Sequence, residues 1–342
     1  MTTHNPTADL ARAAGTFATH YGKPDARARS LPGEKDLNYL IVRAGEPVAV
    51  FKLMHPDTPD DVVALQCDVL AHAGDRGVAL PPVLARVDGA HVGTVDWADG
   101  ARTAYAIGFC AGTRQADLPP LGDNALRELG GAIARLDRAL ADFDHPALDR
   151  PQSWNLTEAA AHARHCHHIA APLDRVSARV LARFSREAAS ALAALPAQAI
   201  HNDLNDHNVL LNVAAFTPSV NALIDVGDCA RQPVICELAI ACAYSAMRQR
   251  DPVGACAALA AGFHAEHALE VDEVDLLPLL IKSRLAVSLA VSSRRAADGA
   301  ADPYQLVSQR DAADLLAALE SVPEGVFRLR LRAALGLPGL PH

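Results

Sequence analysis

The segment that decides the fold reads His201-Asn202-Asp203-Leu204-Asn205-Asp206-His207-Asn208-Val209-Leu210-Leu211. It has the spacing H-x-D-x-x-x-x-N before an apolar run, and a later apolar strand ends in Asp225-Val226-Gly227-Asp228. Phosphoryl transfer to a hydroxyl group needs a carboxylate that orients the hydroxyl and accepts its proton. It also needs oxygen ligands that hold Mg²⁺ against the nucleotide phosphates, and amide and carboxylate oxygens are suitable. The sequence therefore predicts a kinase with Asp203 as catalytic base and Asn208 and Asp225 as magnesium ligands.

A lysine far upstream supports this interpretation. Lys52 lies in a strand-like run at 48–53, where a kinase carries the amine that contacts the nucleotide phosphates. The sequence has no G-x-x-x-x-G-K-[ST] motif, which excludes a P-loop kinase, and the protein-kinase motifs H-R-D, D-F-G and A-P-E are missing. The predicted phosphoryl donor is ATP or GTP with Mg²⁺, and the predicted acceptor is a small molecule with a hydroxyl group.

The composition indicates a globular protein with a small-molecule partner. Half of the 342 residues are apolar and the formal net charge is −9, which argues against nucleic acid as a partner and suits a cationic substrate. Residues 276–291 are the most apolar stretch, but Lys282 and Arg284 interrupt it, so no membrane span is expected. Residues 1–10 show no signal pattern, so we expect a cytoplasmic protein, either a monomer or a homodimer. Seven cysteines without a C-x-x-C pair are expected to be reduced and mostly buried.

Secondary-structure signals divide the chain into two lobes. A helix that ends in a basic, irregular stretch is predicted within 1–30, a second helix at 60–73, a hairpin at 39–51, and further strands at 83–87, 92–95 and 104–109. Beyond Gly112, apolar residues at spacings of three and four predict a core-facing helix at 126–140, and the remainder is mostly helical with short strands near 199–228. We therefore predict an α+β protein with a small strand-rich lobe at 1–110, a helical lobe at 111–342, and a cleft between them near 106–112.

These motifs resemble those of the aminoglycoside phosphotransferase and choline kinase superfamily, and most of all its hydroxylysine kinase branch. The likeness covers nearly the whole chain, with H-P-A-x-x-R at 145–150, W-N-L at 154–156, N-D-x-N at 205–208, I-D-x-G-D at 224–228 and E-L-A at 237–239. The resemblance implies a protein-kinase-like bilobal fold and phosphorylation of a small amino alcohol, hydroxylysine first. Aminoglycoside, choline, ethanolamine and homoserine kinases are the alternatives. An inactive nucleotide-binding module that regulates a partner is an alternative of a different class.

The resemblance also implies further site residues. Residues 34–39 look like a nucleotide-covering loop, and the nucleotide base is expected against the backbone at 106–110. The implied nucleotide contacts are Lys52, Gly33, Asn38, Ala106, Phe109 and Cys110. The implied substrate contacts are Asp206, Asp228, Trp154 and Glu237. For Asp228 and Glu237, capping a helix or bracing the loop at 201–208 is an equal alternative.

Four positions depart from the family pattern. Asn202 replaces the glycine of H-G-D, and asparagine tolerates the left-handed backbone of such a turn. Val226 replaces phenylalanine, which changes packing more than chemistry, and Asn155 replaces the aspartate of W-D-L, which bears on substrate specificity. Gln66 stands where a helix would offer Lys52 a carboxylate. The alternative carboxylate partners are Asp60, Asp61 and Asp68.

One further cluster invites a metal hypothesis. It contains His162, His165, Cys166, His167 and His168. At helical spacing the first three share a face that could bind zinc, but a polar helix face with titrating histidines is the favoured interpretation.

Overall fold

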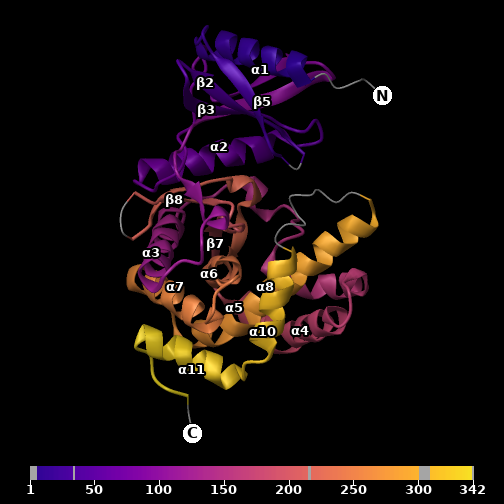
Figure 1. Ribbon diagram of the computed structural model, residues 1–342, viewed down its shortest axis with the longest axis vertical. Coiled ribbons are helices and arrows are strands. Elements are labelled where there is room, and N and C mark those ends of the chain that lie inside the picture. The colour runs from indigo at the N-terminus through magenta and orange to yellow at the C-terminus, as the bar shows by residue number, and fades with distance from the viewer. Residues whose placement is uncertain (1–5, 34, 215–216, 300–308, 341–342) are drawn as a thin grey trace. The chain divides into compact units, whose positions relative to one another are not determined.

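The chain forms two compact units (Figure 1), as seen in a computed structural model that describes residues 6–33, 35–214, 217–299 and 309–340. The first unit comprises Met1–Ala111 together with His145–Ala147. The second comprises Gly112–Asp144 together with Leu148–His342. Three residues from the middle of the chain therefore belong to the N-terminal unit.

A five-stranded antiparallel sheet lies at the centre of the first unit, in the order β1-β2-β3-β5-β4. The strands and helices of this unit are α1 (Pro6–Tyr21), β1 (Arg27–Leu31), β2 (Leu37–Arg43), β3 (Glu46–Leu53), α2 (Asp60–Asp75), β4 (Val92–Trp97) and β5 (Gly100–Gly108). Strands β2 and β3 form the predicted hairpin. Gly45 at its turn has φ +92°, a conformation that glycine adopts at little cost.

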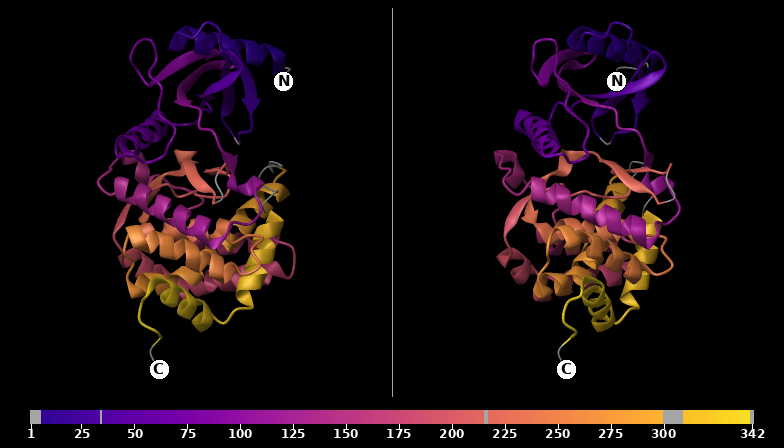
Figure 2. Two further views of the ribbon diagram at one scale, coloured as in Figure 1. Left: turned by 60° about the vertical axis from the view of Figure 1, so that its left-hand side comes forward. Right: turned by 90° about the vertical axis from the view of Figure 1, so that its left-hand side faces the viewer.

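The two helices cover opposite faces of this sheet (Figures 1 and 2). Helix α1 packs Phe17 against Phe51 of β3. Helix α2 packs Cys67 against Tyr105 of β5. Because side chains alternate along a strand, Lys52 lies on the face opposite Phe51, which is the face that α2 covers. The sheet thus directs the predicted phosphate-binding lysine toward α2.

The second unit is mainly helical. Helix α6 (Val234–Ser245) lies at its centre, and nearly all of its residues are buried. The surrounding helices are α3 (Asp123–Ala139), α4 (Leu173–Glu187), α5 (Ala189–Ala194), α7 (Pro252–Glu266), α8 (Val271–Ala297), α10 (Gln309–Glu320) and α11 (Glu324–Leu335). Two small sheets, β6-β8-β9 and β7-β10, carry the loops of interest. Their strands are β6 (Thr113–Arg114), β7 (Ala197–Ile200), β8 (Val209–Asn212), β9 (Ser219–Leu223) and β10 (Ala230–Pro233).

Helices α3 and α7 meet through their backbones. A Cβ atom at Gly262 would collide with the carbonyl oxygen of Arg127, and one at Gly130 would collide with that of Leu259. Both positions therefore exclude any side chain. The predicted apolar stripe of α3 is confirmed, since all of its members are buried: Leu126, Leu129, Ile133, Leu136 and Leu140.

Three local predictions differ from the structure. Residues 27–31 form β1 and not an irregular stretch, because they pair with β2 along their whole length. Within 83–87 only Val83 forms a bridge, because the N–H of Arg86 bonds to Ala90 in a turn. Residues 156–168 form a 3₁₀ helix, η3 (Leu156–His168), and not an α-helix.

The prediction for the cysteines agrees with the structure. All seven cysteines are free, and all except Cys110 are buried. Within the described ranges, no helix combines the length and the apolar character needed to cross a membrane.

Candidate active site

The predicted catalytic loop, residues 201–208, connects β7 to β8. Its second residue, Asn202, has φ +68°, so the prediction that asparagine preserves the left-handed turn is confirmed. The Asn202 side chain donates hydrogen bonds to Oδ1 of Asn155 (2.9 Å) and to the carbonyl oxygen of Asp228 (3.1 Å). Asn155 and Asn202, both departures from the family pattern, are therefore bonded to each other.

Two buried side chains hold this loop from the interior. Oε2 of Glu237, a fully buried residue of α6, accepts the backbone N–H of Asn202 at 2.8 Å. The Nε2 atom of His201 lies 2.9 Å from the carbonyl oxygen of Ile224. Since a carbonyl oxygen only accepts, Nε2 carries a proton, and burial lowers the pKa of His201, which favours the neutral imidazole. Glu237 thus has the geometry of a loop brace.

The carboxylate of Asp203 accepts hydrogen bonds from three side chains. Oδ1 accepts from Arg284 at 2.8 Å, and Oδ2 accepts from Asn205 at 2.9 Å and from Asn208 at 3.2 Å. The side chain keeps 20% of its surface exposed, which leaves an approach for a hydroxyl group. Burial raises the pKa of Asp203 to about 8, against the positive charge of Arg284, which lowers it.

Arg284 is a site residue that the sequence reasoning missed. It lies on α8 and is only 1% exposed. Besides Asp203, its guanidinium donates to the carbonyl oxygen of Trp154 at 2.9 Å and lies over the rings of Trp154 and Tyr244, at 5.3 and 5.6 Å from their centroids. Arg295 lies over the same Trp154 ring at 5.6 Å. Trp154, predicted as a substrate contact, therefore packs between two arginines.

Asn208 and Asp225 lie beside each other at the ends of β8 and β9. The carbonyl oxygen of Asn208 accepts the N–H of Ile224 at 2.9 Å, and Asp225 is the next residue. The Asn208 side-chain nitrogen donates to the carbonyl oxygen of Asp203 at 2.8 Å, so the amide oxygen is the atom of this side chain that could serve as a metal ligand. Asp225 is exposed and has φ +65°. One amide oxygen and one carboxylate are hard ligands, so the residues present fit Mg²⁺.

The turn that contains Asp228 is held by residues of the H-P-A-x-x-R region. Arg150 donates to the carbonyl oxygens of Gly227 (2.6 Å) and Cys229 (2.8 Å). Gln152 donates to the carbonyl oxygen of Asp228 at 2.8 Å. The Asp228 carboxylate is close enough to raise the pKa values of both Asp203 and Arg284. Asp228 therefore adds negative charge beside the proposed base.

In the first unit, Lys52 lies over an aromatic ring. Its Nζ atom is 5.7 Å from the centroid of Tyr105, its partner in the β3–β5 ladder. The Tyr105 hydroxyl donates to Oε1 of Gln66 at 2.7 Å, so the amide at the expected carboxylate position is engaged by this tyrosine. Of the alternative acids, Asp60 accepts from Thr103 at 3.0 Å, and Asp68 lies 3.9 Å from His145.

The other predicted nucleotide contacts of the first unit lie on two segments. Gly33 precedes β2, where a Cβ atom would clash with Asp36 and with the Asn38 side chain, whose amide bonds to Pro32 at 3.3 Å. Glu34, the first residue of the predicted covering loop, lies outside the described residues. The other segment ends β5 and comprises Ala106, which is buried within the sheet, Phe109, which is 40% exposed, and Cys110, which is partly exposed.

The histidine-rich segment lies on η3. Three residues per turn place His162, His165 and His168 along one edge, and His165 lies 6.2 and 6.4 Å from its two neighbours between ring centroids. Cys166 points inward and is buried. In the part of the chain that the structure describes, no three His, Cys, Asp or Glu side chains converge in a way that could hold a metal ion.

Comparison with known proteins identifies the family. A sequence model of the phosphotransferase enzyme family (APH) matches residues 27–274, well over half of the chain. The chain belongs to this phosphotransferase enzyme family. It is a small-molecule phosphotransferase, and the predicted superfamily is confirmed.

Relatives of this phosphotransferase include curated kinases. Hydroxylysine kinase from Bos taurus is 24% identical over 313 residues, which cover 84% of this chain and 82% of the relative. The Danio rerio hydroxylysine kinase is 24% identical over 286 residues, 80% of each chain.

Solved structures confirm the protein-kinase-like α+β fold. A microcompartment-associated aminopropanol kinase matches with a TM-score of 0.67 and 19% identity, over 95% of this chain and 98% of that one. The amicoumacin kinase hAmiN, in complex with AMP-PNP, Ca²⁺ and Ami, matches with a TM-score of 0.66 and 13% identity, over 94% and 95%.

Proposed function

We propose that this phosphotransferase moves the γ-phosphoryl group of ATP or GTP to the hydroxyl group of a small amino alcohol, with hydroxylysine as the first candidate. The observation that carries the proposal is the Asp203 carboxylate, fixed by one guanidinium and two amides. In this proposal Asp203 orients the acceptor hydroxyl and takes its proton, Asn208 and Asp225 hold Mg²⁺, and Lys52 contacts the phosphates. When bound, the metal ion would neutralise charge on the phosphoryl oxygens.

Local charge supports an amine-bearing acceptor. Asp228 places a second carboxylate near Asp203, and a charge-assisted hydrogen bond between a carboxylate and an ammonium group contributes about 1.5–3 kcal/mol. The alignments with two relatives named hydroxylysine kinase cover most of this chain, which supports an amino alcohol as the acceptor.

A polycationic aminoglycoside is a weaker candidate. Glu324 is the only acidic residue in the last twenty positions of the chain. Its carboxylate is already within 2.9 Å of Arg183 and 3.0 Å of Arg328, with Lys282 at 3.8 Å. Glu324 is thus surrounded by cations of the protein itself.

A substrate panel tests the proposal. The purified full-length chain would be assayed with hydroxylysine, ethanolamine, choline, homoserine and kanamycin, each with ATP and with GTP. We expect the highest kcat/KM for an amino alcohol. Efficient phosphorylation of kanamycin alone would overturn the acceptor assignment, and no acceptor-dependent turnover with any compound would favour an inactive nucleotide-binding module.

Removing the proposed base tests the residue assignment. The variant Asp203→Asn keeps the shape of the side chain, so nucleotide should still bind, but turnover should fall by roughly 10²- to 10⁴-fold. Asp314→Asn is the matched control, because Asp314 is 77% exposed on α10. If Asp203→Asn worked within a few-fold of the control, Asp203 would not be the base.

A further inference from the structure

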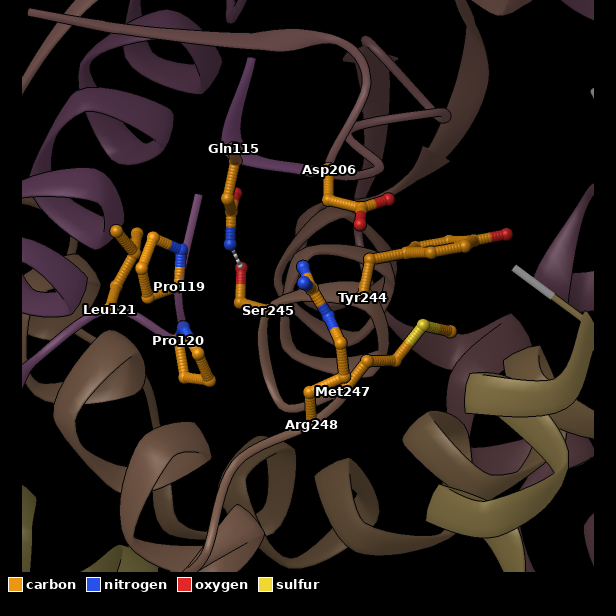
Figure 3. A pocket seen from close by; sticks show the side chains of 9 residues that line it. All are labelled: Gln115, Pro119, Pro120, Leu121, Asp206, Tyr244, Ser245, Met247 and Arg248. Carbon is orange, nitrogen blue, oxygen red and sulfur yellow. Dashed lines mark hydrogen bonds between the residues drawn. The ribbon is translucent and has the colours of Figure 1, made fainter. Parts of the chain in front are cut away.

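A polar pocket lies beside the catalytic loop within the second unit (Figure 3). Residues 119–121 and Met247 form its apolar wall. Gln115, Asp206, Tyr244 and Ser245 form its polar side. The cavity volume of about 10 Å³ is enough for about one water-sized group, which is also the size of an ammonium head.

Two buried acceptor atoms of this pocket have no hydrogen-bond donor among the described residues. They are Oδ1 of Asp206, a residue that is 7% exposed, and Oε1 of Gln115, which is 6% exposed. The Gln115 side-chain nitrogen donates to the Ser245 hydroxyl at 3.0 Å (dashed in Figure 3), which fixes the amide and leaves its oxygen as the spare acceptor. Buried acceptors without a donor are unfavourable, so this pair indicates a ligand that donates hydrogen bonds.

A backbone hydrogen bond joins the two segments that carry these acceptors. The N–H of Ala116, the residue after Gln115, donates to the carbonyl oxygen of Asp206 at 2.9 Å. The nearest arginine of the pocket, Arg248, is exposed and directs its guanidinium to the carbonyl oxygens of Leu118 and Ala116, both at 3.3 Å. It also pairs with Asp311 at 3.6 Å. Among the described residues no cation forms a hydrogen bond with Asp206, although the charges of His207 and Arg248 act on its carboxyl from further away.

We propose that this pocket binds a primary ammonium group of the acceptor, separate from the amine beside the phosphorylated hydroxyl. The preferred acceptor would then be a hydroxyl compound with two amino groups. This inference rests on the proposed function and narrows its substrate class, since ethanolamine and choline carry one nitrogen and hydroxylysine carries two amines.

The pocket is within reach of the proposed base. Tyr244 lines the pocket and also packs against Arg284, which donates to Asp203. Asp206 itself is three residues after Asp203, and such a segment spans at most about 11 Å. An acceptor a few carbon atoms long can therefore place its hydroxyl at Asp203 and its remote ammonium at Asp206 and Gln115.

Binding of two non-reactive probes tests the pocket without requiring phosphoryl transfer. L-Lysine and ε-aminocaproate differ in the α-amino group alone, and neither has a hydroxyl group to phosphorylate. In titration calorimetry with the full-length protein we expect lysine to bind about tenfold more tightly, the value of one charge-assisted hydrogen bond. Gln115→Leu and Asp206→Asn should each reduce this preference severalfold, whereas Met247→Leu, in the apolar wall, should keep it.

The outcomes separate this inference from the proposed function. Equal affinity of the two probes, no binding of either, or full preference in Gln115→Leu and Asp206→Asn would overturn the ammonium site. If lysine bound with the expected preference but the panel showed no phosphorylated amino alcohol, the site would stand and the proposed function would fail. If hydroxylysine were phosphorylated but the protein showed no preference for lysine over ε-aminocaproate, the proposed function would stand and the ammonium site would fail.

Discussion

At the scale of single residues, the proposed catalytic carboxylate has an ion-pair partner far away in the sequence. Asp203 and Arg284 are 81 residues apart, and their ion pair is almost fully enclosed on the arginine side. Removing one member of such a pair leaves the other without its partner. Arg284 therefore holds the base in place without itself needing to touch the acceptor.

Replacing Arg284 should impair turnover more than nucleotide binding. We expect Arg284→Met to lower kcat by about 10- to 100-fold, the effect of losing one hydrogen bond to a charged group. Because the guanidinium charge lowers the pKa of Asp203, its loss should also move the acidic limb of the pH–kcat profile to higher pH.

Lys282→Met is the matched control for this arginine. Lys282 is buried on the same helix but pairs with Glu320 at 3.1 Å, away from Asp203. This control should lose stability and keep its pH profile. If Arg284→Met and Lys282→Met had the same pH–kcat profile, Arg284 would have only a structural role.

The pair of Asn155 and Asn202 predicts an energetic coupling. Asn202→Ala loses two hydrogen bonds and places alanine at a positive φ, so we expect a loss of about 2–4 kcal/mol in the free energy of unfolding. Asn202→Gly should cost less, because glycine accepts this backbone conformation. Urea unfolding of the single and double variants with Asn155→Ala measures the coupling, and strictly additive effects would contradict a direct bond.

The position and the left-handed turn of the loop at 201–208 could be predicted from sequence, because they follow from local residue types and spacings. Asp203, Asn208 and Asp225 follow fixed spacings, and the left-handed turn at Asn202 follows from its residue type. Arg284 gave no such signal: in the sequence it is one of two charges in the apolar stretch 276–291, and only the folded chain brings it to Asp203.

At the scale of elements, the crossing of α3 and α7 determines which positions tolerate a side chain. We expect Gly262→Ala to destabilise the protein by about 1–3 kcal/mol or more, because the new Cβ meets backbone that cannot rotate away. Gly131→Ala is the control on α3, since the nearest atom to its Cβ would be the flexible tip of Arg135, at 3.2 Å, and the carbonyl oxygen of Gly262 would lie at 3.6 Å, an ordinary van der Waals distance. Thermal unfolding should separate the two variants, and equal melting temperatures would refute the close contact.

The errors at this scale have a common physical cause. Strand β1 has exposed and half-exposed side chains, so it lacks the apolar alternation that predicts a strand, and its pairing with β2 stabilises it. The segment at 83–87 has apolar residues but closes into a turn. The spacing of apolar residues indicates which face of an element is buried, but it does not determine which groups the backbone N–H and C=O groups bond to.

At the scale of the whole molecule, the proposed function requires residues from both units. Lys52 belongs to the first unit, and Asn208 and Asp225 belong to the second. We expect Asp225→Ala to lose most of its magnesium-dependent nucleotide affinity, because a carboxylate ligand is removed. Lys52→Ala should raise the KM for the nucleotide, whereas Lys23→Ala, at an exposed position after α1, should not.

Magnesium titrations with a fluorescent nucleotide analogue measure these effects. An unchanged magnesium dependence in Asp225→Ala would remove that residue from the site.

The α+β class and the division into a strand-rich part and a helical part were predictable from sequence, because composition and periodicity change after Gly112. The return of residues 145–147 to the first unit was not, since three residues carry no periodic signal.

The bracing of the catalytic loop has a consequence for the heat of nucleotide binding. Glu237, His201, Asn205 and Arg284 hold the loop by contacts that the protein makes with itself. The loop therefore loses its conformational entropy when the protein folds and not when the ligand binds. Nucleotide association should lack the large negative heat-capacity change of coupled folding and binding, as far as this loop contributes to it. A variant that lacks one of these contacts would order the loop only when the nucleotide binds. Calorimetry at several temperatures would then show a more negative heat-capacity change of binding.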